Sequence, residues 1–201
     1  MEFFVTADTH FDHESILHYC NRPFDSIEAM NDALVERWNG LVGRRDKVYI
    51  VGDFAFKRHL RWLNALRGKK VLIRGNHDSA SQKVYASFTE VHDLLVRRVN
   101  EQQVVFCHYA LRTWPDNNQG AWHVYGHSHG RLTESPVRRS CDVGVDVWDY
   151  APIPWEVLAR KLDTRVPETP DENDARSETE ANVEALRGEN LAHRRGETPN
   201  G

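Results

Sequence analysis

The amino-acid sequence predicts an α/β fold with a strand-rich second half. Short runs rich in β-branched and aromatic residues have the length and composition of strands, and they occur at residues 3–7, 48–51, 71–73, 104–107, 123–125 and 143–147. Helical patterns separate the first three runs and follow the last one, whereas none separates the final three.

Three segments predict helices. Residues 26–41 carry apolar side chains at helical spacing, and Asp25 with Glu28 three residues later is a candidate capping box at the start. Gly40 and Gly43 supply a stop signal at the end. Residues 59–66 and 154–162 fit two shorter helices, and the second of these begins at a proline.

Length and composition predict one globular domain at residues 1–163, followed by a polar, acidic tail at residues 164–201. The chain has 201 residues, of which 40% are hydrophobic and six are tryptophan, and this is enough for a single sizeable core. The tail has no aromatic residue and holds nine Asp or Glu against five Arg. We therefore expect the tail to be disordered.

The predicted domain is formally neutral. Removing the charges of the tail from the 26 basic and 30 acidic residues of the chain leaves 21 of each. A neutral domain lacks the basic stripe with which proteins grip the many phosphates of long nucleic acid. We therefore expect small or short substrates and no long nucleic acid as a partner.

The cysteines and the first residues indicate the compartment. Cys20, Cys107 and Cys141 are odd in number and show no paired spacing, so we expect reduced thiols. The first residues lack the basic flank and apolar run of a signal peptide, and no stretch approaches the length of a membrane span. These features predict a cytoplasmic protein that does not engage a membrane.

Side chains that can bind metal follow five of the predicted strands. They are Asp8 and His10 after the first strand, Asp53 after the second, Asn76 and His77 after the third, His108 at the end of the fourth, and His127 and His129 after the fifth. Ligands of α/β sheets bind outside the carboxyl ends of the strands. We therefore expect these side chains to meet at one edge.

Three of these five groups, taken alone, have an ordinary structural explanation. The segments around Asp8 and Asp53 are compatible with turn chemistry after a strand, and His108 with a buried core histidine. His127 and His129 lie two residues apart at a strand end, which favours a shared ligand site even without the others. Turn and core roles do not account for five such groups in order, each at the end of a strand.

The predicted ligand set suits two divalent transition-metal ions. Such a pair, roughly 3.5–4 Å apart, needs a bridging carboxylate and further ligands that leave room for water and substrate. Asp53 is the candidate bridge. Mixed carboxylate, amide and imidazole ligands favour Mn, with Fe, Ni, Zn or Co as alternatives, over Ca or Mg.

These motifs together resemble those of the calcineurin-like metallophosphoesterases over roughly residues 3–150. The ordered set reads Asp8-x-His10, Gly52-Asp53, Gly75-Asn76-His77-Asp78, His108 and Gly126-His127-x-His129. The resemblance implies a β-sandwich of two sheets flanked by helices, with the metals on loops at one edge. It also implies that one metal is held by Asp8, His10 and His129, that the other is held by Asn76, His108 and His127, and that Asp53 bridges them. His77 would be the catalytic residue that contacts phosphate and assists the leaving group.

One departure disfavours a phosphoprotein substrate. The protein-phosphatase branch reads Gly-Asp-x-x-Asp-Arg-Gly, whereas this chain reads Gly52-Asp53-Phe54-Ala55-Phe56-Lys57-Arg58. The aspartate that orients the catalytic histidine is therefore missing, and the adjacent Asp78 is one candidate replacement. The chain looks more like small single-domain bacterial and phage members, which often carry an opening like Asp8-Thr9-His10-Phe11-Asp12-His13 and a segment like Asn21-Arg22-Pro23-Phe24.

Three residues are candidate substrate contacts. His13 lies just past the predicted metal ligands, with an exposed turn histidine as the alternative. Arg22, like Arg74, could pair with a phosphate, with surface solvation as the alternative. Trp114 lies on a polar loop between two metal-bearing strands and could stack on a base, with core packing as the alternative.

The sequence thus predicts hydrolysis of a phosphate ester by a water that two metals activate. A diester carries one negative charge where a monoester carries about two at neutral pH, so a site with few cations favours a small phosphodiester or nucleotide. The alternatives are a phosphomonoesterase, a catalytically silent binding module on the same fold, and a nuclease. The natural substrate and the oligomeric state stay open.

Overall fold

Two β-sheets packed face to face form the centre of the protein. The computed structural model describes residues 1–135 and 138–165. The five-stranded sheet has the order β4-β3-β2-β1-β9 and contains β1 (Phe3–Thr6), β2 (Lys47–Val51), β3 (Lys69–Ile73), β4 (Glu90–His92) and β9 (Ile153–Pro154). The four-stranded sheet has the order β5-β6-β7-β8 and contains β5 (Leu94–Val99), β6 (Gln102–Cys107), β7 (Trp122–Tyr125) and β8 (Ser140–Asp142).

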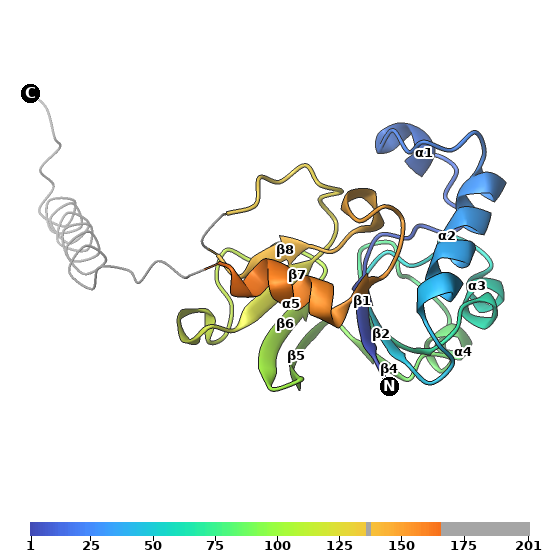
Figure 1. The fold of residues 1–201 in the computed structure, drawn as a ribbon. Helices are drawn as coiled ribbons and strands as arrows, with labels where there is room; N and C mark the ends of the chain where they lie inside the picture. Colours follow the sequence, from blue (N-terminus) through green and yellow to red (C-terminus); the bar gives the residue numbers. More distant parts are fainter. Residues whose placement is uncertain (136–137, 166–201) are drawn as a thin grey trace, which may run out of the picture. The chain divides into compact units, whose positions relative to one another are not determined.

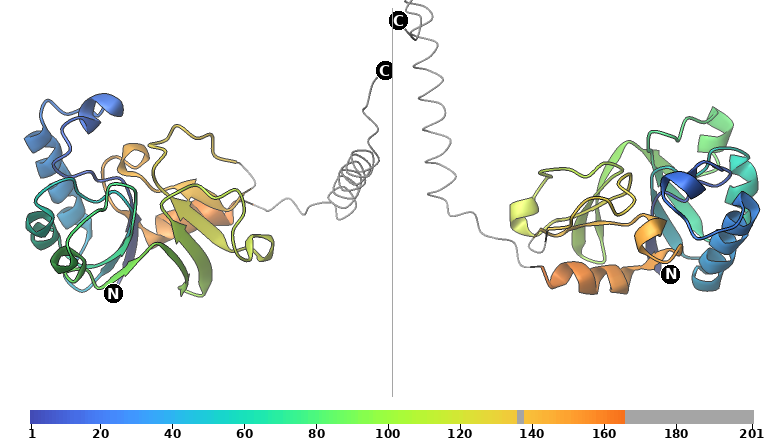
Figure 2. Two further views of the ribbon diagram at one scale, coloured as in Figure 1. Left: turned by 180° about the vertical axis from the view of Figure 1, so that it is seen from behind. Right: turned by 90° about the horizontal axis from the view of Figure 1, so that it is seen from above.

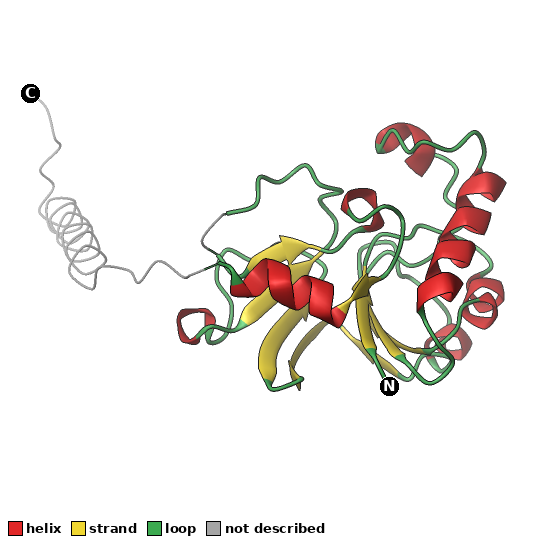
Figure 3. Cartoon of the chain, viewed as in Figure 1, coloured by secondary structure: helices red, strands yellow, loops and turns green. Residues whose placement is uncertain are grey.

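Helices cover the face of the five-stranded sheet that points away from the other sheet (Figure 1). These are α2 (Ile27–Leu41), α3 (His59–Ala65) and α4 (Gln82–Tyr85), and the short α1 (Ile16–Tyr19) adds Ile16 to the same core. Helix α5 (Trp155–Asp163) lies along an edge of the sandwich (Figure 2), where the ring of Trp155 stacks on that of Trp122 with centroids 5.3 Å apart. Two short 3-10 turns, η1 (Asn117–Gln119) and η2 (Val145–Val147), lie among the loops (Figure 3).

Both faces of the five-stranded sheet are buried, as expected for its parallel strands. Successive side chains of a strand point to opposite faces, so Phe4 joins the core beneath the helices and Val5 joins the core between the sheets. The same alternation places Val48 and Ile50 of β2 beneath the helices, whereas Tyr49 faces the second sheet.

The fold class predicted from the sequence is confirmed: two sheets are flanked by helices. Five of the six predicted strands are present, with bounds within two residues of the expected ones. The strand predicted at residues 143–147 is wrong. Strand β8 ends at Asp142, Gly144 forms only an isolated bridge to Ala7, and residues 145–147 form η2. Val143 and Val145 are nevertheless buried, which explains why this segment has the composition of a strand.

The start of α2 also differs from the expectation. Ser26 is the N-cap, and its hydroxyl accepts a hydrogen bond from the backbone N–H of Ala29 at 3.1 Å. The predicted capping box of Asp25 and Glu28 is therefore wrong, because the serine between them supplies the capping oxygen.

Other expectations concern the chain as a whole. The three cysteines are free, as predicted. Within the described part of the chain, every helix is too short or too polar to cross a bilayer. The predicted tail at residues 164–201 lies outside the described residues, except for Thr164 and Arg165.

The strand directions bring the predicted ligand loops to one edge. Strands β1, β2 and β3 are parallel to one another, and so are β6 and β7, so within each sheet the carboxyl ends of these strands share an edge. The backbone joins the two sheets at that edge, where Ala7 bridges Gly144 and accepts a hydrogen bond from Val145 N–H at 3.0 Å. This junction places the loop after β1 beside the loops that follow the strands of the second sheet.

Candidate metal centre and active site

The loops after β1 and β2 are held together by backbone hydrogen bonds. Asp8 N–H donates to the carbonyl of Gly52, and His10 N–H donates to the carbonyl of Asp53, both at 3.0 Å. These bonds continue the pairing of the parallel strands past their ends. As a result, Asp8 and His10 lie beside Asp53, as the sequence predicted.

Five of the seven predicted metal ligands have left-handed backbone conformations. Their φ angles are 57° at Asp8, 50° at His10, 55° at Asp53, 65° at His127 and 47° at His129. This conformation costs roughly 1–2 kcal/mol for a residue with a side chain. Strain of this kind persists only where the surrounding structure fixes the backbone, and it gathers at functional sites.

Two buried carboxylates fix the backbone of these loops. Asp78 accepts hydrogen bonds from the N–H groups of Asp53 at 2.7 Å, Phe54 at 2.9 Å and Gly75 at 2.8 Å. Asp142 accepts hydrogen bonds from the Ser128 hydroxyl and from Gly130 N–H at 2.9 Å. Asp78 thus clamps the loops after β2 and β3, and Asp142 clamps the loop that carries His127 and His129.

Glycines precede three of these candidate ligands, and at Gly52 and Gly75 a neighbouring candidate ligand occupies the space that a side chain would need. A Cβ at Gly52, whose φ is +91°, would overlap the imidazole of His108. A Cβ at Gly75 would overlap the carboxylate of Asp53. The Gly-Asp and Gly-Asn pairs of the sequence therefore follow from close packing at the site.

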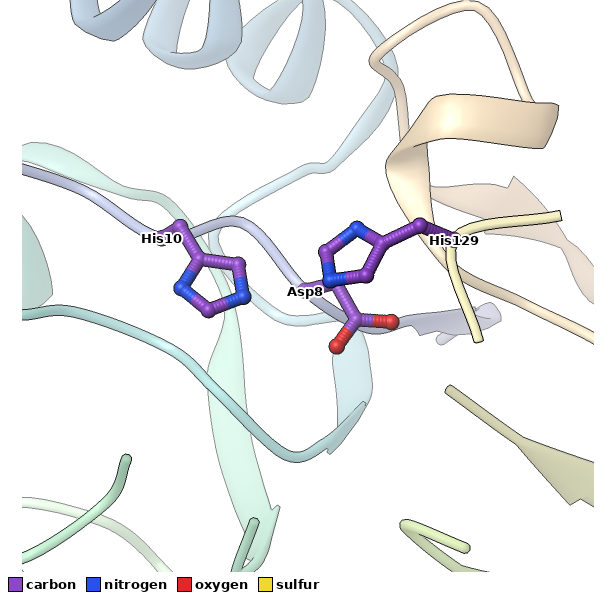
Figure 4. Close-up of side chains that lie close together, drawn as sticks. All are labelled: Asp8, His10 and His129. Carbon is purple, nitrogen blue, oxygen red and sulfur yellow. The ribbon is translucent and has the colours of Figure 1, made fainter. Parts of the chain in front are cut away.

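Asp8, His10 and His129 form a first group of ligand atoms within 4.8 Å of one another (Figure 4). Burial raises the pKa of Asp8 to about 7 and lowers the pKa of His10 to about 2, so the His10 ring is neutral. Nε2 of His10 is buried and has no hydrogen-bond partner among the described residues. A buried ring nitrogen without a partner is costly unless a ligand binds to it.

Asp53, His108 and His127 form a second group with the same spacing of ligand atoms. Asn76 belongs with them, because its Oδ1 lies 3.1 Å from Nε2 of His108. Oδ2 of Asp53 lies 3.5 Å from Nε2 of His108 and 3.5 Å from Nε2 of His10 in the first group. The structure therefore brings all seven predicted ligands together in two adjacent groups that meet at Asp53.

The electrostatics of the site favour positive charge. Burial alone would raise the pKa of Asp53, but the hydrogen bond with His108, the charges of His108 and His10 and the hydrogen bond from His77 N–H together outweigh it and hold that pKa at about 2. Burial alone would lower the pKa of His108, but the hydrogen bond with Asp53, the charges of Asp53 and Asp8 and the contact with the carbonyl of Val51 together outweigh that effect and raise the pKa. Buried carboxylates that stabilise a charged imidazole would also stabilise a bound cation.

His129 is oriented by an aspartate that sequence reasoning missed. Nδ1 of His129 lies 2.7 Å from Oδ2 of Asp146, which η2 positions. Burial alone would lower the pKa of His129, but this hydrogen bond, a second one with Cys20 and the charges of Asp8 and Asp146 together outweigh it and raise the pKa to about 10. The contact engages Nδ1 and leaves Nε2 as the nitrogen that could bind a metal. Asp146 lies among valines in a segment for which the sequence predicts a strand, so it was not recognised as a candidate site residue.

Arg22 completes this arrangement instead of facing substrate. Its side chain is fully buried, and Nε and Nη2 each donate to the Asp146 carboxylate at 2.8 Å. The same guanidinium donates to the carbonyl of Asp8 at 2.6 Å and to that of Thr9 at 3.1 Å. The predicted substrate contact for Arg22 does not fit the structure, because the buried guanidinium is held by protein groups.

Trp114 also has a structural role in place of the one predicted. Its ring is only 6% exposed, and its Nε1–H donates to the carbonyl of Ala121 at 2.9 Å. The ring packs against His123 in a small core with Val105. A ring buried in this way has no free face for a base, so core packing, the alternative reading of this tryptophan, is correct.

His77 and His13 lie at the exposed side of the first ligand group. The His77 ring is exposed, with its centroid 5.4 Å from that of His10 and 5.6 Å from that of His13. Among residues 1–135 and 138–165, no side chain forms a hydrogen bond with the His77 ring. Asp78 does not orient His77, since its carboxylate is occupied by the backbone N–H groups of Asp53, Phe54 and Gly75.

A comparison with known protein families identifies the family of this chain. The sequence matches the model of the calcineurin-like phosphoesterase superfamily domain over residues 1–140, more than half of the chain. The chain belongs to the calcineurin-like phosphoesterase superfamily. The resemblance predicted from the motifs is therefore confirmed, and membership indicates phosphate-ester hydrolysis as the general activity.

Relatives of this phosphoesterase occur in an archaeon and in a phage. It is 31% identical to the protein MJ1445 of Methanocaldococcus jannaschii, and the match covers 81% of this chain and 92% of that one. It is 25% identical to the Gene 66 protein of Mycobacterium phage L5, and the match covers 71% of this chain and 86% of that one. Among solved structures, the protein AQ665 from Aquifex aeolicus shares the fold with a TM-score of 0.63 at 20% identity, over 79% of this chain and 98% of that one.

The residues present in this phosphoesterase fit the divalent metal ions that are general to the superfamily. The unpartnered Nε2 of His10 and the two groups of ligand atoms provide the donors that such ions need. The mixture of carboxylate, amide and imidazole donors is of the kind that first-row transition metals prefer.

Proposed function

We propose that this protein hydrolyses small phosphodiesters, with nucleotides or cyclic nucleotides as the leading substrate class, using two divalent transition-metal ions. One observation carries the proposal: two adjacent groups of ligand atoms meet at Asp53, whose Oδ2 lies 3.5 Å from both His10 Nε2 and His108 Nε2. A carboxylate with that placement suits a bridge between two ions.

In this proposal each residue of the site has a defined role. Asp8, His10 and His129 would hold one ion, Asn76, His108 and His127 would hold the other, and Asp53 would serve both. Mn is the expected ion, and Fe, Ni, Zn or Co could replace it. When bound, such a pair supplies a water that is nucleophilic at neutral pH and neutralises charge on the phosphoryl oxygens.

His77 is proposed to donate a proton to the leaving oxygen. Its ring is exposed beside the first ligand group, and its backbone N–H donates a 2.9 Å hydrogen bond to Oδ1 of Asp53. The backbone is therefore held while the imidazole is free to meet substrate. A residue that acts as a general acid needs this combination of position and access.

The preference for a diester is supported by how the nearby arginines are used. Arg22 is bound to Asp146, Arg58 is bound to Asp12, and Arg74 is bound to Asp93. Each of these cations is thus already paired with a carboxylate. A diester, with one negative charge, needs less cationic support than a monoester with about two.

The test combines metal analysis with hydrolysis of model esters. Protein reconstituted separately with Mn, Ni, Zn or Mg is assayed for bound metal and for turnover of bis-p-nitrophenyl phosphate and p-nitrophenyl phosphate. We expect about two transition-metal ions per chain and a preference for the diester. Protein that binds no metal would refute the metal centre, and a marked preference for the monoester would refute the diesterase.

A matched pair of variants tests the role of Asp53. Asp53→Asn should lose metal and activity, because Asp53 contributes to both ligand groups. Asp149→Asn is the control, since Asp149 also has a left-handed backbone, with φ 49°, but its side chain is exposed. Normal hydrolysis by Asp53→Asn would contradict the proposed bridge.

A further inference from the structure

Phe56 has a large apolar side chain and is exposed to solvent beside the proposed active site. The residue is 48% exposed, yet its backbone is fixed, because its N–H donates to the carbonyl of Phe11 at 2.8 Å. The preceding Ala55 forms a β-bridge with Phe11. The position of the ring is therefore set by the loop after β2 and its pairing with the segment after β1.

The ring of Phe56 forms one layer of a stack at the edge of the site. It lies parallel to the ring of His13, with centroids 4.5 Å apart and planes 10° apart. His13 in turn contacts His10, with the two Nδ1 atoms 3.2 Å apart. Since His13 stacks on one face of the phenyl ring, a base would have to stack on the other face.

Phe56 is also close to the proposed general acid. The centroid of its ring lies 6.2 Å from that of His77. An organic group attached to a phosphate that reaches His77 would therefore pass next to the phenyl ring.

A hollow of about 410 Å³ opens beside this stack. Its lining includes His13, Ile27, Phe56, Lys57 and Arg58. The volume lies within the range of about 300–1,000 Å³ that is usual for small-molecule sites. The hollow thus has room for a planar ring and a sugar.

The hollow also offers hydrogen-bond donors. Arg58 is fixed by its contacts with Asp12, which use Nε at 2.8 Å and Nη2 but leave Nη1 free within the described part of the chain. The ammonium group of Lys57 has no ion pair or hydrogen bond to another described residue. Both groups could donate to oxygen or nitrogen acceptors on a ring.

We propose that this hollow binds the aromatic base of a nucleotide substrate, with the base stacked on Phe56 and its acceptor atoms facing Lys57 and Arg58. The inference rests on the proposed function, which places the phosphate at the metal centre. It assigns to Phe56 the stacking role that the buried Trp114 does not have. Stacking of a base on an aromatic side chain is sequence-tolerant, because every base has an aromatic face.

Calorimetric binding to the metal-loaded full chain tests this proposal. Adenosine 5′-monophosphate and ribose 5-phosphate carry the same phosphate on the same sugar and differ in the base. We expect the nucleotide to bind about tenfold more tightly, in line with the usual contribution of one stacked base. Phe56→Ala should reduce the ratio of the two affinities to near one, whereas Phe56→Tyr should retain it.

Tyr109→Ala is the matched control. Tyr109 is 46% exposed and lies at the other side of the site, where its ring meets His108 and His127 at steep angles. We expect this variant to keep the preference for the nucleotide. Equal affinities in the wild type, or a preference lost in Tyr109→Ala but kept in Phe56→Ala, would overturn the assignment.

The binding measurement separates this inference from the proposed function. A base-dependent affinity that requires Phe56, in a protein that hydrolyses no ester with any metal, would support the subsite and reject the diesterase. Hydrolysis of bis-p-nitrophenyl phosphate without any base preference would reject the subsite alone.

Discussion

Replacing Asp146 by asparagine should destabilise the protein and weaken its hold on metal. The carboxylate is paired with Arg22, whose side chain is fully buried, and it also accepts the hydrogen bond from His129. Burial alone would raise the pKa of Asp146, but the hydrogen bonds and the charges of both His129 and Arg22 together outweigh it, so the pKa is lowered. Asp146→Asn would leave the Arg22 guanidinium charged, buried and without its counter-ion.

The magnitude follows from that burial. Breaking a buried ion pair by removing one partner costs about 3–5 kcal/mol, because the remaining charge is uncompensated. For a domain of this size, each kcal/mol lowers the melting temperature by about 2–4 °C. We therefore expect metal-free Asp146→Asn to melt roughly 6–20 °C below the wild type. Loss of the group that orients a metal-binding histidine should weaken metal binding by about 10–100-fold.

Thermal denaturation of the metal-free protein and calorimetric titration with Mn measure the two effects separately. The Arg22→Met background provides a further check. In that background Asp146→Asn leaves no buried positive charge without its partner, so it should lower the free energy of unfolding by less. Asp149→Asn is the control, since the Arg37–Asp149 pair is exposed and should contribute about 0–1 kcal/mol. A melting temperature within about 2 °C of the wild type, together with unchanged metal affinity, would refute the reasoning.

Three further outcomes are expected. His77→Gln should keep its metal and lower turnover by roughly a hundredfold or more, with a smaller loss for p-nitrophenyl esters than for alkyl esters; an equal loss for both would assign His77 to phosphate positioning instead. A chain that ends after Arg165 should fold and hydrolyse esters as the full chain does, because it retains the hydrogen bonds of Arg165 to Glu134 and to the carbonyl of Ser140. Aggregation or loss of activity in this shortened chain would show that the residues after Arg165 belong to the domain. Burial lowers the pKa of His123, so the unfolded chain binds more protons than the folded chain, and the free energy of unfolding should fall as pH drops below roughly 6.5. Urea denaturation between pH 5 and 8, with metal bound, should show a smaller fall in this free energy for His123→Gln than for the wild type. Identical pH profiles for the two proteins would contradict this.

Residues in short motifs could be predicted well from the sequence. Asp8, His10 and Asp53 directly follow buried strands, and parallel strands bring such positions to one edge whatever the details of packing. The seven candidate ligand positions and His77 therefore followed from their places after predicted strands, and the family resemblance separated His77 from the other seven. Their division into two groups came from the family resemblance.

Contacts that depend on tertiary packing could not be predicted. Arg22 and Asp146 are separated by 124 residues, and nothing in either local segment indicates that they pair. Composition likewise cannot distinguish the buried ring of Trp114 from the exposed ring of Phe56, because both residue types occur in cores and in binding sites. Strand β5 was missed because its two central arginines interrupt the apolar pattern of an exposed strand.

The left-handed conformations at Asp8, His10, Asp53, His127 and His129 bear on how this protein can change under selection. Glycine adopts that conformation without steric penalty, so substitution by glycine at any of the five positions relieves local strain. In a screen for heat resistance alone, this relief of strain would offset part of the cost of losing a proposed metal ligand. Stabilised forms of this phosphoesterase have to be sought at other positions, with hydrolysis screened in parallel.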